Sequence, residues 1–143
     1  MTKTRKGSVA VTAVAREDLL QLAQFRRSLR KVLADSEDIC IEAGLTSQRF
    51  QALLAIASMD APVSVGDLAG ELMLKHHSAV ELVDRLAQAG LIARVADAQD
   101  KRRVLLSLTA RGGQALHHLA ARHLAQLDEA RQALMHGLQG KTN

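Results

Sequence analysis

The spacing of apolar residues changes between residues 91 and 108, and this change constrains the fold more than any other feature of the chain. On both sides of it, apolar residues recur every three or four positions, as in amphipathic helices. Within it, Leu91–Val95 and Val104–Leu108 follow a two-residue period around a polar tip. The pattern predicts a two-stranded hairpin inserted into an otherwise helical chain.

The composition also favours helices. Apolar residues form 48% of the 143 residues, but Trp and Tyr do not occur and Phe occurs only twice. Leu, Ala and Val must therefore fill the core, and Ala and Leu are strong helix formers. The fold class that we expect is mainly α with a small β wing.

The charge and the single cysteine narrow the class of protein. Lys and Arg number 19 against 15 Asp and Glu, a net charge of +4 that is compatible with a nucleic-acid partner. Cys40 alone excludes an internal disulfide. No run approaches the roughly 18 apolar residues that a membrane span needs, and residues 1–18 do not form a secretory signal. We expect a cytoplasmic protein without a membrane partner.

Capping and turn residues divide the first part of the chain. Residues 1–15 carry basic side chains without a sustained period, which predicts a flexible arm. Residues 16–60 are expected to form N-terminal helices for dimerisation and support: one long helix that ends near Gly44, and a second that is capped by Thr46. The inward stripe of the second helix is expected to contain Phe50, Leu53, Leu54 and Ala57.

Residues 61–109 predict a winged helix-turn-helix lobe. Ser64 and Asp67 have the spacing of a capping box, which starts a short helix. A second helix follows from near Lys75 to Gly90, where a left-handed residue can end it. Two helices with a tight connection predict a helix-turn-helix, and the hairpin that follows predicts the wing.

Residues 110–143 resume helical spacing after Thr109, in one long helix or two. Neither this region nor the first long helix has a full partner for its apolar stripe within one chain. We therefore expect the terminal helices to pack together in a homodimer, with 110–143 as the C-terminal dimerisation region.

Four groups of residues occur in a characteristic order between Gly44 and Gly112. They are Gly44-Leu45-Thr46 with Phe50 and Leu53; Asp67-Leu68-Ala69; Leu82-Val83-Asp84-Arg85-Leu86 with Gly90-Leu91-Ile92 and Arg94; and Asp100-Lys101-Arg102 with Leu108-Thr109 and Gly112. This ordered set resembles the multiple-antibiotic-resistance regulator (MarR) family. The resemblance implies a triangular homodimer with interlocking terminal helices. It also implies a transcriptional regulator. Members of the family are mostly repressors, and many are released from DNA by small phenolic or other lipophilic ligands or by cysteine oxidation.

The helix near Lys75 is expected to enter the major groove of DNA, where base edges are distinguishable. Its amino end carries Lys75, His76, His77 and Ser78, which can face phosphates and bases. Ser78 also has capping-box spacing with residue 81, so a later helix start, with the histidines in the turn, stays open.

Two residues further along this helix extend the candidate site. Arg85 is assigned to the DNA-binding set. The family commonly has hydroxyl and basic residues at the positions that correspond to Val80 and Glu81, and this chain departs from that pattern. Glu81 can accept from cytosine N4, cap the helix or pair with Arg85.

The wing tip supplies the second expected contact. Arg102 is the candidate for insertion into the minor groove of A·T-rich DNA, which attracts arginine. Asp100 is expected to fix the turn and to lie close enough to orient a guanidinium, while Lys101 and Arg103 lie on or near phosphates. Arg94 can either brace the wing or contact a phosphate.

Other chemistry has little support. No nucleophile elbow, phosphate loop or metal-protease motif occurs, so we expect neither an enzyme nor a cofactor. His117 and His118 have no histidine or carboxylate four residues later, as a shared metal ion would favour. The acidic residues around Cys40 should raise the pKa of its thiol, which favours a packed or idle cysteine over a peroxide sensor.

The sequence thus predicts a homodimeric winged helix-turn-helix regulator, more a repressor than an activator, of a near-palindromic double-stranded DNA operator. Release by a small-molecule effector is an additional possibility. The alternative is a winged-helix protein-interaction module whose basic wing is incidental.

Overall fold

The structure is a computed structural model that describes residues 12–60 and 62–139. Its helices are α1 Arg16–Glu42, α2 Ser47–Ser58, α3 Val65–Glu71, α4 His76–Gln88 and α5 Ala110–Gln139. Its strands are β1 Val63–Ser64, β2 Ile92–Ala96 and β3 Val104–Leu108. The expected fold class, mainly α with a small β wing, is confirmed. Of the flexible basic arm expected over residues 1–15, residues 1–11 lie outside the described residues.

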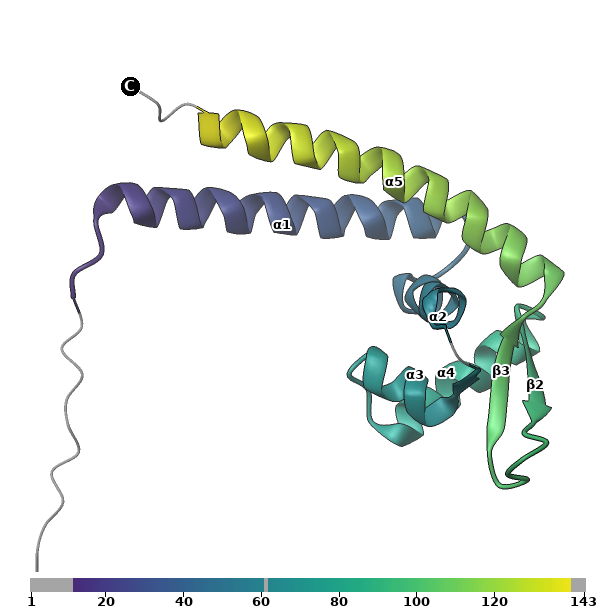
Figure 1. Ribbon diagram of the computed structural model, residues 1–143. Coiled ribbons are helices and arrows are strands. Elements are labelled where there is room, and N and C mark those ends of the chain that lie inside the picture. The colour runs from purple at the N-terminus through teal and green to yellow at the C-terminus, as the bar shows by residue number, and fades with distance from the viewer. Residues whose placement is uncertain (1–11, 61, 140–143) are drawn as a thin grey trace, which may run out of the picture.

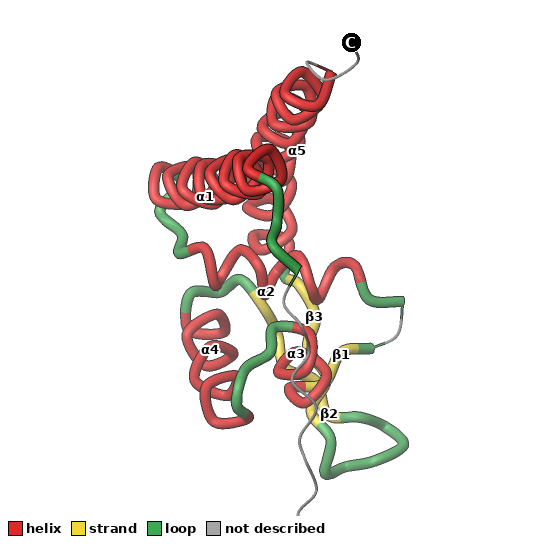
Figure 2. The backbone as a smooth tube through the Cα atoms, turned by 90° about the vertical axis from the view of Figure 1, so that its left-hand side faces the viewer, coloured by secondary structure: helices red, strands yellow, loops and turns green. Residues whose placement is uncertain are grey.

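The two long helices α1 and α5 lie side by side and antiparallel, above a lobe formed by the other elements (Figure 1). Gln126 of α5 donates to the carbonyl oxygen of Val32 in α1 at 2.8 Å, and Arg122 pairs with Glu42 closer to the lobe. In the view along α1, the lobe lies below α1 and α5 (Figure 2). Among the described residues, none of the helices combines the length and the apolar content that a membrane span requires.

The predicted caps are confirmed where they define the lobe. The hydroxyl of Thr46 accepts from the N–H of Arg49 at 3.2 Å, and Ser64 and Asp67 form a complete capping box at the start of α3. Gly90 follows the end of α4 by two residues and has a φ of +72°, the left-handed conformation expected where this helix stops. The α4 helix begins at His76, so the later start is wrong.

The core is built mainly from Leu, Ala and Val, as the composition predicts. The α2 helix packs on α1 and α5 on one side and on α3 and the sheet on the other, so it buries a wider surface than one stripe. Phe50 and Leu53 are buried as expected, but Leu54 is 44% exposed and Ala57 is also exposed. The buried residues of α2 are Phe50, Ala52, Leu53, Ala55 and Ile56.

The sheet contains one strand that the sequence did not indicate. The strand order is β1-β3-β2, with both pairings antiparallel. Val63 of β1 is paired with Leu106, and Ser64 with Leu105. A two-residue strand is too short to show a period, which is why the sequence predicted only the hairpin of β2 and β3.

A crowded junction joins α4, the hairpin and α5. Thr109 donates its hydroxyl hydrogen to the carbonyl oxygen of Gly90 at 2.6 Å, and its oxygen accepts from the N–H of Gly112 at 3.0 Å. The N–H of Thr109 donates to the carbonyl oxygen of Leu91 at 3.1 Å. A Cβ on Gly112 would lie 1.9 Å from that same oxygen of Leu91, so only glycine fits there. The junction therefore explains four residues of the family resemblance by close packing.

Gly112→Ala is expected to lower the free energy of unfolding by about 1–3 kcal/mol or more, because the new methyl group must displace backbone. Gly113→Ala is the matched control, since a Cβ at Gly113 meets nothing within 4 Å. That change should be neutral or stabilising by about 0.5–1 kcal/mol, because alanine replaces a helical glycine. Urea unfolding measures both, and equal effects of the two substitutions would contradict the close approach.

Candidate nucleic-acid interface

The buried face of α4 determines which residues it presents outward. Ala79, Leu82, Val83 and Leu86 are buried against the lobe. The exposed residues of α4 and its N-cap include four members of the predicted DNA-binding set, Lys75, His76, His77 and Arg85, together with Val80, Glu81 and Gln88. Ser78 is half-buried, and no ion pair joins Glu81 to Arg85 among the described residues.

The turn between α3 and α4 places the amino end of α4 at the surface. The N–H of Leu74 donates to the carbonyl oxygen of Ala69 at 2.8 Å, which closes the end of α3. Met73 has a φ of +52°, the only positive φ of a non-glycine residue among those described. This left-handed position normally suits glycine, so the turn contains backbone strain next to the exposed helix end.

The tip of the hairpin is held by its own aspartates. The carboxylate of Asp97 accepts from the N–H of Gln99 at 2.9 Å, and that of Asp100 accepts from the N–H of Arg102 at 3.0 Å. The carbonyl oxygen of Asp100 also accepts from the N–H of Arg103 at 2.9 Å. Asp100 therefore fixes the turn through the backbone, whereas no guanidinium of the described residues is paired with it.

The tip and the amino end of α4 meet across one groove of about 420 Å³. His76 and Val80 line it from α4, and Asp100, Arg102 and Arg103 line it from the wing. Lys101 and Arg102 are exposed, and neither is in an ion pair among the described residues. The structure thus brings parts of both predicted contact regions to one open face.

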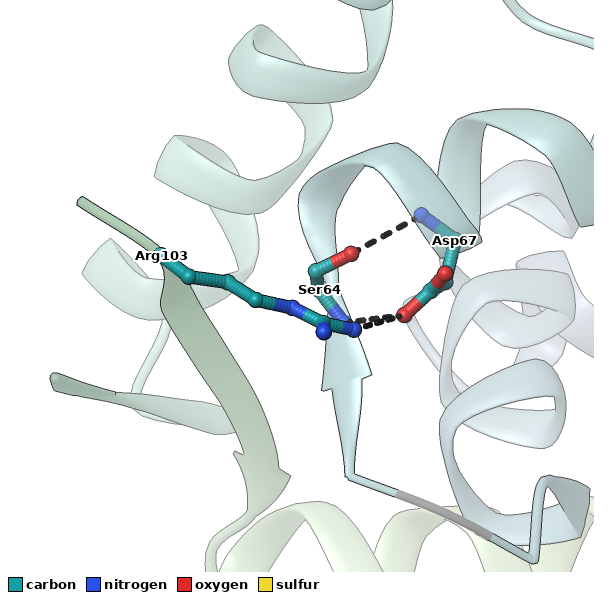
Figure 3. Close-up of polar contacts among 3 residues, drawn as sticks. All are labelled: Ser64, Asp67 and Arg103. Carbon is teal, nitrogen blue, oxygen red and sulfur yellow. Dashed lines mark hydrogen bonds and ion pairs between the residues drawn. The ribbon is translucent and has the colours of Figure 1, made fainter. Parts of the chain in front are cut away.

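Two ion pairs fasten the hairpin to the helices. Nη1 of Arg94 on β2 lies 2.6 Å from Oδ1 of Asp84 on α4. This contact agrees with bracing of the wing, one of the two roles expected for Arg94. Nη2 of Arg103 lies 2.9 Å from Oδ2 of Asp67 on α3, as Figure 3 shows. The sequence indicated Asp67 as a helix cap and as part of the family resemblance but not as a partner of Arg103, because nothing local links residues 36 positions apart.

The pKa of the Asp67 carboxyl group is lowered from its ordinary value. The backbone N–H of Ser64 is the main cause of the lowered pKa of its carboxyl group; the Ser64 hydroxyl and Arg103 lower it further. The pair with Arg103 is therefore present at neutral pH. Because the folded-state pKa lies below the ordinary value, the contribution of this carboxylate to stability is lost as pH falls through the lowered pKa.

Cys40 and His123 both take part in packing between the helices. Cys40 is fully buried, and burial is the main cause of the raised pKa of its thiol; Arg122 opposes the rise and Glu37 adds to it. The ring of His123 stacks on Phe50 with centroids 4.3 Å apart. Its Nδ1 donates to the carbonyl oxygen of Leu119 at 2.8 Å, a packing role that its sequence position did not reveal. In the described part of the chain, no three His, Cys, Asp or Glu side chains gather as a metal site would require.

The fold defines a class of protein in which two long helices carry a winged helix-turn-helix lobe. Residues 43–103 match the model of the MarR family, which confirms the resemblance seen in the sequence. The matched segment, which contains the helix-turn-helix, β2 and the tip of the wing, is therefore similar to the MarR family. No curated protein matches the chain in sequence.

Solved structures of transcription regulators share this fold. AbsC, a MarR family transcriptional regulator from Streptomyces coelicolor, aligns with a TM-score of 0.70 at 18% identity over 92% of this chain and 100% of AbsC. A mutant of MepR from S. aureus, bound to an oligodeoxyribonucleotide, aligns with a TM-score of 0.64 at 21% identity over 85% and 83% of the two chains. NadR in complex with 4-hydroxyphenylacetate aligns with a TM-score of 0.68 at 23% identity over 94% and 86%.

Met73→Gly is expected to raise the free energy of unfolding by about 1 kcal/mol, because glycine adopts the left-handed conformation without a steric cost. Met73 is 92% exposed, so little packing is lost with its side chain. Met73→Ala is the control, since alanine keeps the Cβ and should give no such gain. If urea unfolding shows that glycine and alanine have the same effect, the turn is not strained.

Proposed function

We propose that this chain is a cytoplasmic, homodimeric transcriptional repressor that binds a near-palindromic double-stranded DNA operator. The observation that carries the proposal is the common face formed by the amino end of α4 and the wing tip, where His76 and Arg102 line one groove. In this arrangement, α4 enters the major groove while the wing reaches the adjacent minor groove. The structure of MepR bound to an oligodeoxyribonucleotide, which has the same fold, supports DNA as the partner.

The residues of this face divide into two roles. Lys75, His76 and His77, at the exposed start of α4, contact phosphates and base edges. At the wing, Arg102 enters the minor groove, while Lys101 contacts a phosphate. Arg85 extends the contact along α4, with half-buried Ser78 at its edge.

Uncovered apolar surface on the long helices supports the homodimer. Figure 1 shows the first half of α1 and the last half of α5 extending beyond the lobe. A stripe on α1 remains open although α5 packs beside it, with Leu22, Phe25, Leu29 and Leu33 between 43% and 69% exposed. A second copy of the chain would cover this stripe and would set the spacing between two lobes.

The two lobes give the operator its form. A two-fold dimer requires half-sites related by a two-fold axis, with centres about one helical turn, roughly 34–36 Å, apart. An effector would release the DNA if it bound more tightly to a lobe spacing that does not fit these half-sites. NadR, whose structure contains 4-hydroxyphenylacetate, supports a small-molecule effector for this fold.

Gel shift with the DNA upstream of its own gene tests the proposal. Because cationic side chains displace counterions from phosphates, we expect a shift whose affinity falls steeply with salt, by about 0.9 in log–log slope for each phosphate contacted. A protein that retards no duplex even at low salt would instead fit a winged-helix protein-interaction module.

Arg102→Ala is expected to weaken operator binding by about 1–3 kcal/mol and to leave the dimer intact, because Arg102 lies at the exposed tip. Arg131→Ala removes the same charge from the far half of α5 and should change the affinity little. Fluorescence anisotropy with the labelled upstream fragment measures both at physiological salt. Unchanged affinity of the Arg102 variant would remove this residue from the interface.

Leu29→Glu should convert the dimer to monomers, because a charge would be buried in the apolar contact between the two copies. Gln24→Glu adds the same charge at an exposed polar position of α1 and is the control. Light scattering coupled to gel filtration should give twice the chain mass of 15.4 kDa for the wild type and the control, and the single chain mass for the Leu29 variant. A monomeric wild type would contradict the assembly.

A further inference from the structure

We propose that Arg103 is a positioning residue: its ion pair with Asp67 holds the wing where Arg102 can reach the DNA. The inference rests on the proposed function and changes the role expected for Arg103. The sequence placed this side chain on or near phosphates, as it did Lys101. The structure instead directs its guanidinium to the start of α3 (Figure 3).

The anchor for Arg103 is rigid. Oδ2 of Asp67 accepts from Nη2 of Arg103 and from the N–H of Ser64, each at 2.9 Å. In return, the N–H of Asp67 donates to the hydroxyl of Ser64 at 3.1 Å. These reciprocal bonds fix the carboxylate to the first turn of a helix, so it cannot follow a moving wing. The ion pair between Arg103 and this carboxylate therefore holds the wing against α3.

The surroundings of Arg103 disfavour a phosphate contact. Together with Asp60, Asp67 and Glu71, Arg103 lines a surface groove between the end of α2 and α3. These three carboxylates would repel a phosphate group that approached from that side. Arg103 also lines the groove between α4 and the wing, but its guanidinium is paired with Asp67. The acidic groove therefore suits an internal ion pair, whereas neighbouring Arg102 does not line it.

The position of Arg103 in the hairpin explains why the pair controls the tip. Arg103 is the residue between the tip turn and β3, and its N–H and carbonyl oxygen bond to Asp100 and Asp97. Arg94 secures β2 to α4 further from the tip. With Arg103 released, the segment beyond residue 96 would keep only its internal turn bonds, and ordering it on DNA would cost conformational entropy.

Four variants separate positioning from a direct contact. Asp67→Asn removes the charge but keeps an oxygen that can accept from Ser64, and Arg103→Met removes the guanidinium but keeps an unbranched side chain. The double variant measures their coupling. Asp67→Glu retains the carboxylate and the capping-box residue, so it is the conservative rescue.

The measurements are fluorescence anisotropy with the upstream fragment over a series of salt concentrations, and thermal unfolding without DNA. We expect Asp67→Asn and Arg103→Met each to weaken binding about two- to five-fold per wing, the range of a half-exposed ion pair. The double variant should bind no more weakly than either single variant, and Asp67→Glu should bind like the wild type. The salt slope should not change in any of them.

The sign of the Asp67→Asn effect is decisive. If Arg103 contacts a phosphate, removal of the nearby negative charge should strengthen binding, and Arg103→Met should lower the salt slope by about 0.9 per wing. Either result would overturn the positioning role, as would thermal destabilisation with unchanged affinity. A wild-type protein that binds no DNA would overturn the proposed function and this inference together. Binding by the wild type that is lost in Arg102→Ala but unaffected in Asp67→Asn would overturn this inference alone.

Discussion

The close approach of Gly112 to the backbone of Leu91 is the constraint on which the rest of the structure depends. At this point α4 ends, the hairpin begins and returns, and α5 starts. Thr109 bonds to Gly90 and Leu91 on one side and to Gly112 on the other. Because no side chain separates these backbones, α4, the wing and the long helix α5 are held as one unit.

This unit explains how distant parts of the protein can act together. A dimer that is built on α1 and α5 would set the positions of two lobes, and each lobe would present its helix and its wing in a fixed relation. Arg94 and Arg103 complete that relation by tying the two sides of the hairpin to α4 and α3. In the proposed function, the charged side chains at the wing tip would reach DNA only because the backbone that carries them is ordered.

Local signals in the sequence predicted most of the fold and part of the site. Helical period, the caps Thr46 and Ser64, and the glycine after α4 gave the order of elements, because each depends on a few neighbouring residues. The two-residue strand β1 and the exposure of Leu54 were missed, since they depend on packing between distant elements. The bond from Arg103 to Asp67 was missed for the same reason.

Simultaneous engagement of both grooves by each lobe is the central claim. Footprinting on the DNA upstream of its own gene tests it most directly, with dimethyl sulfate for guanine N7 in the major groove and hydroxyl radicals for the minor-groove edge. Two patches of major-groove protection, each flanked by a minor-groove patch and related by a two-fold axis, would agree with the account. Protection confined to one kind of groove, or to a single unrepeated patch, would contradict it.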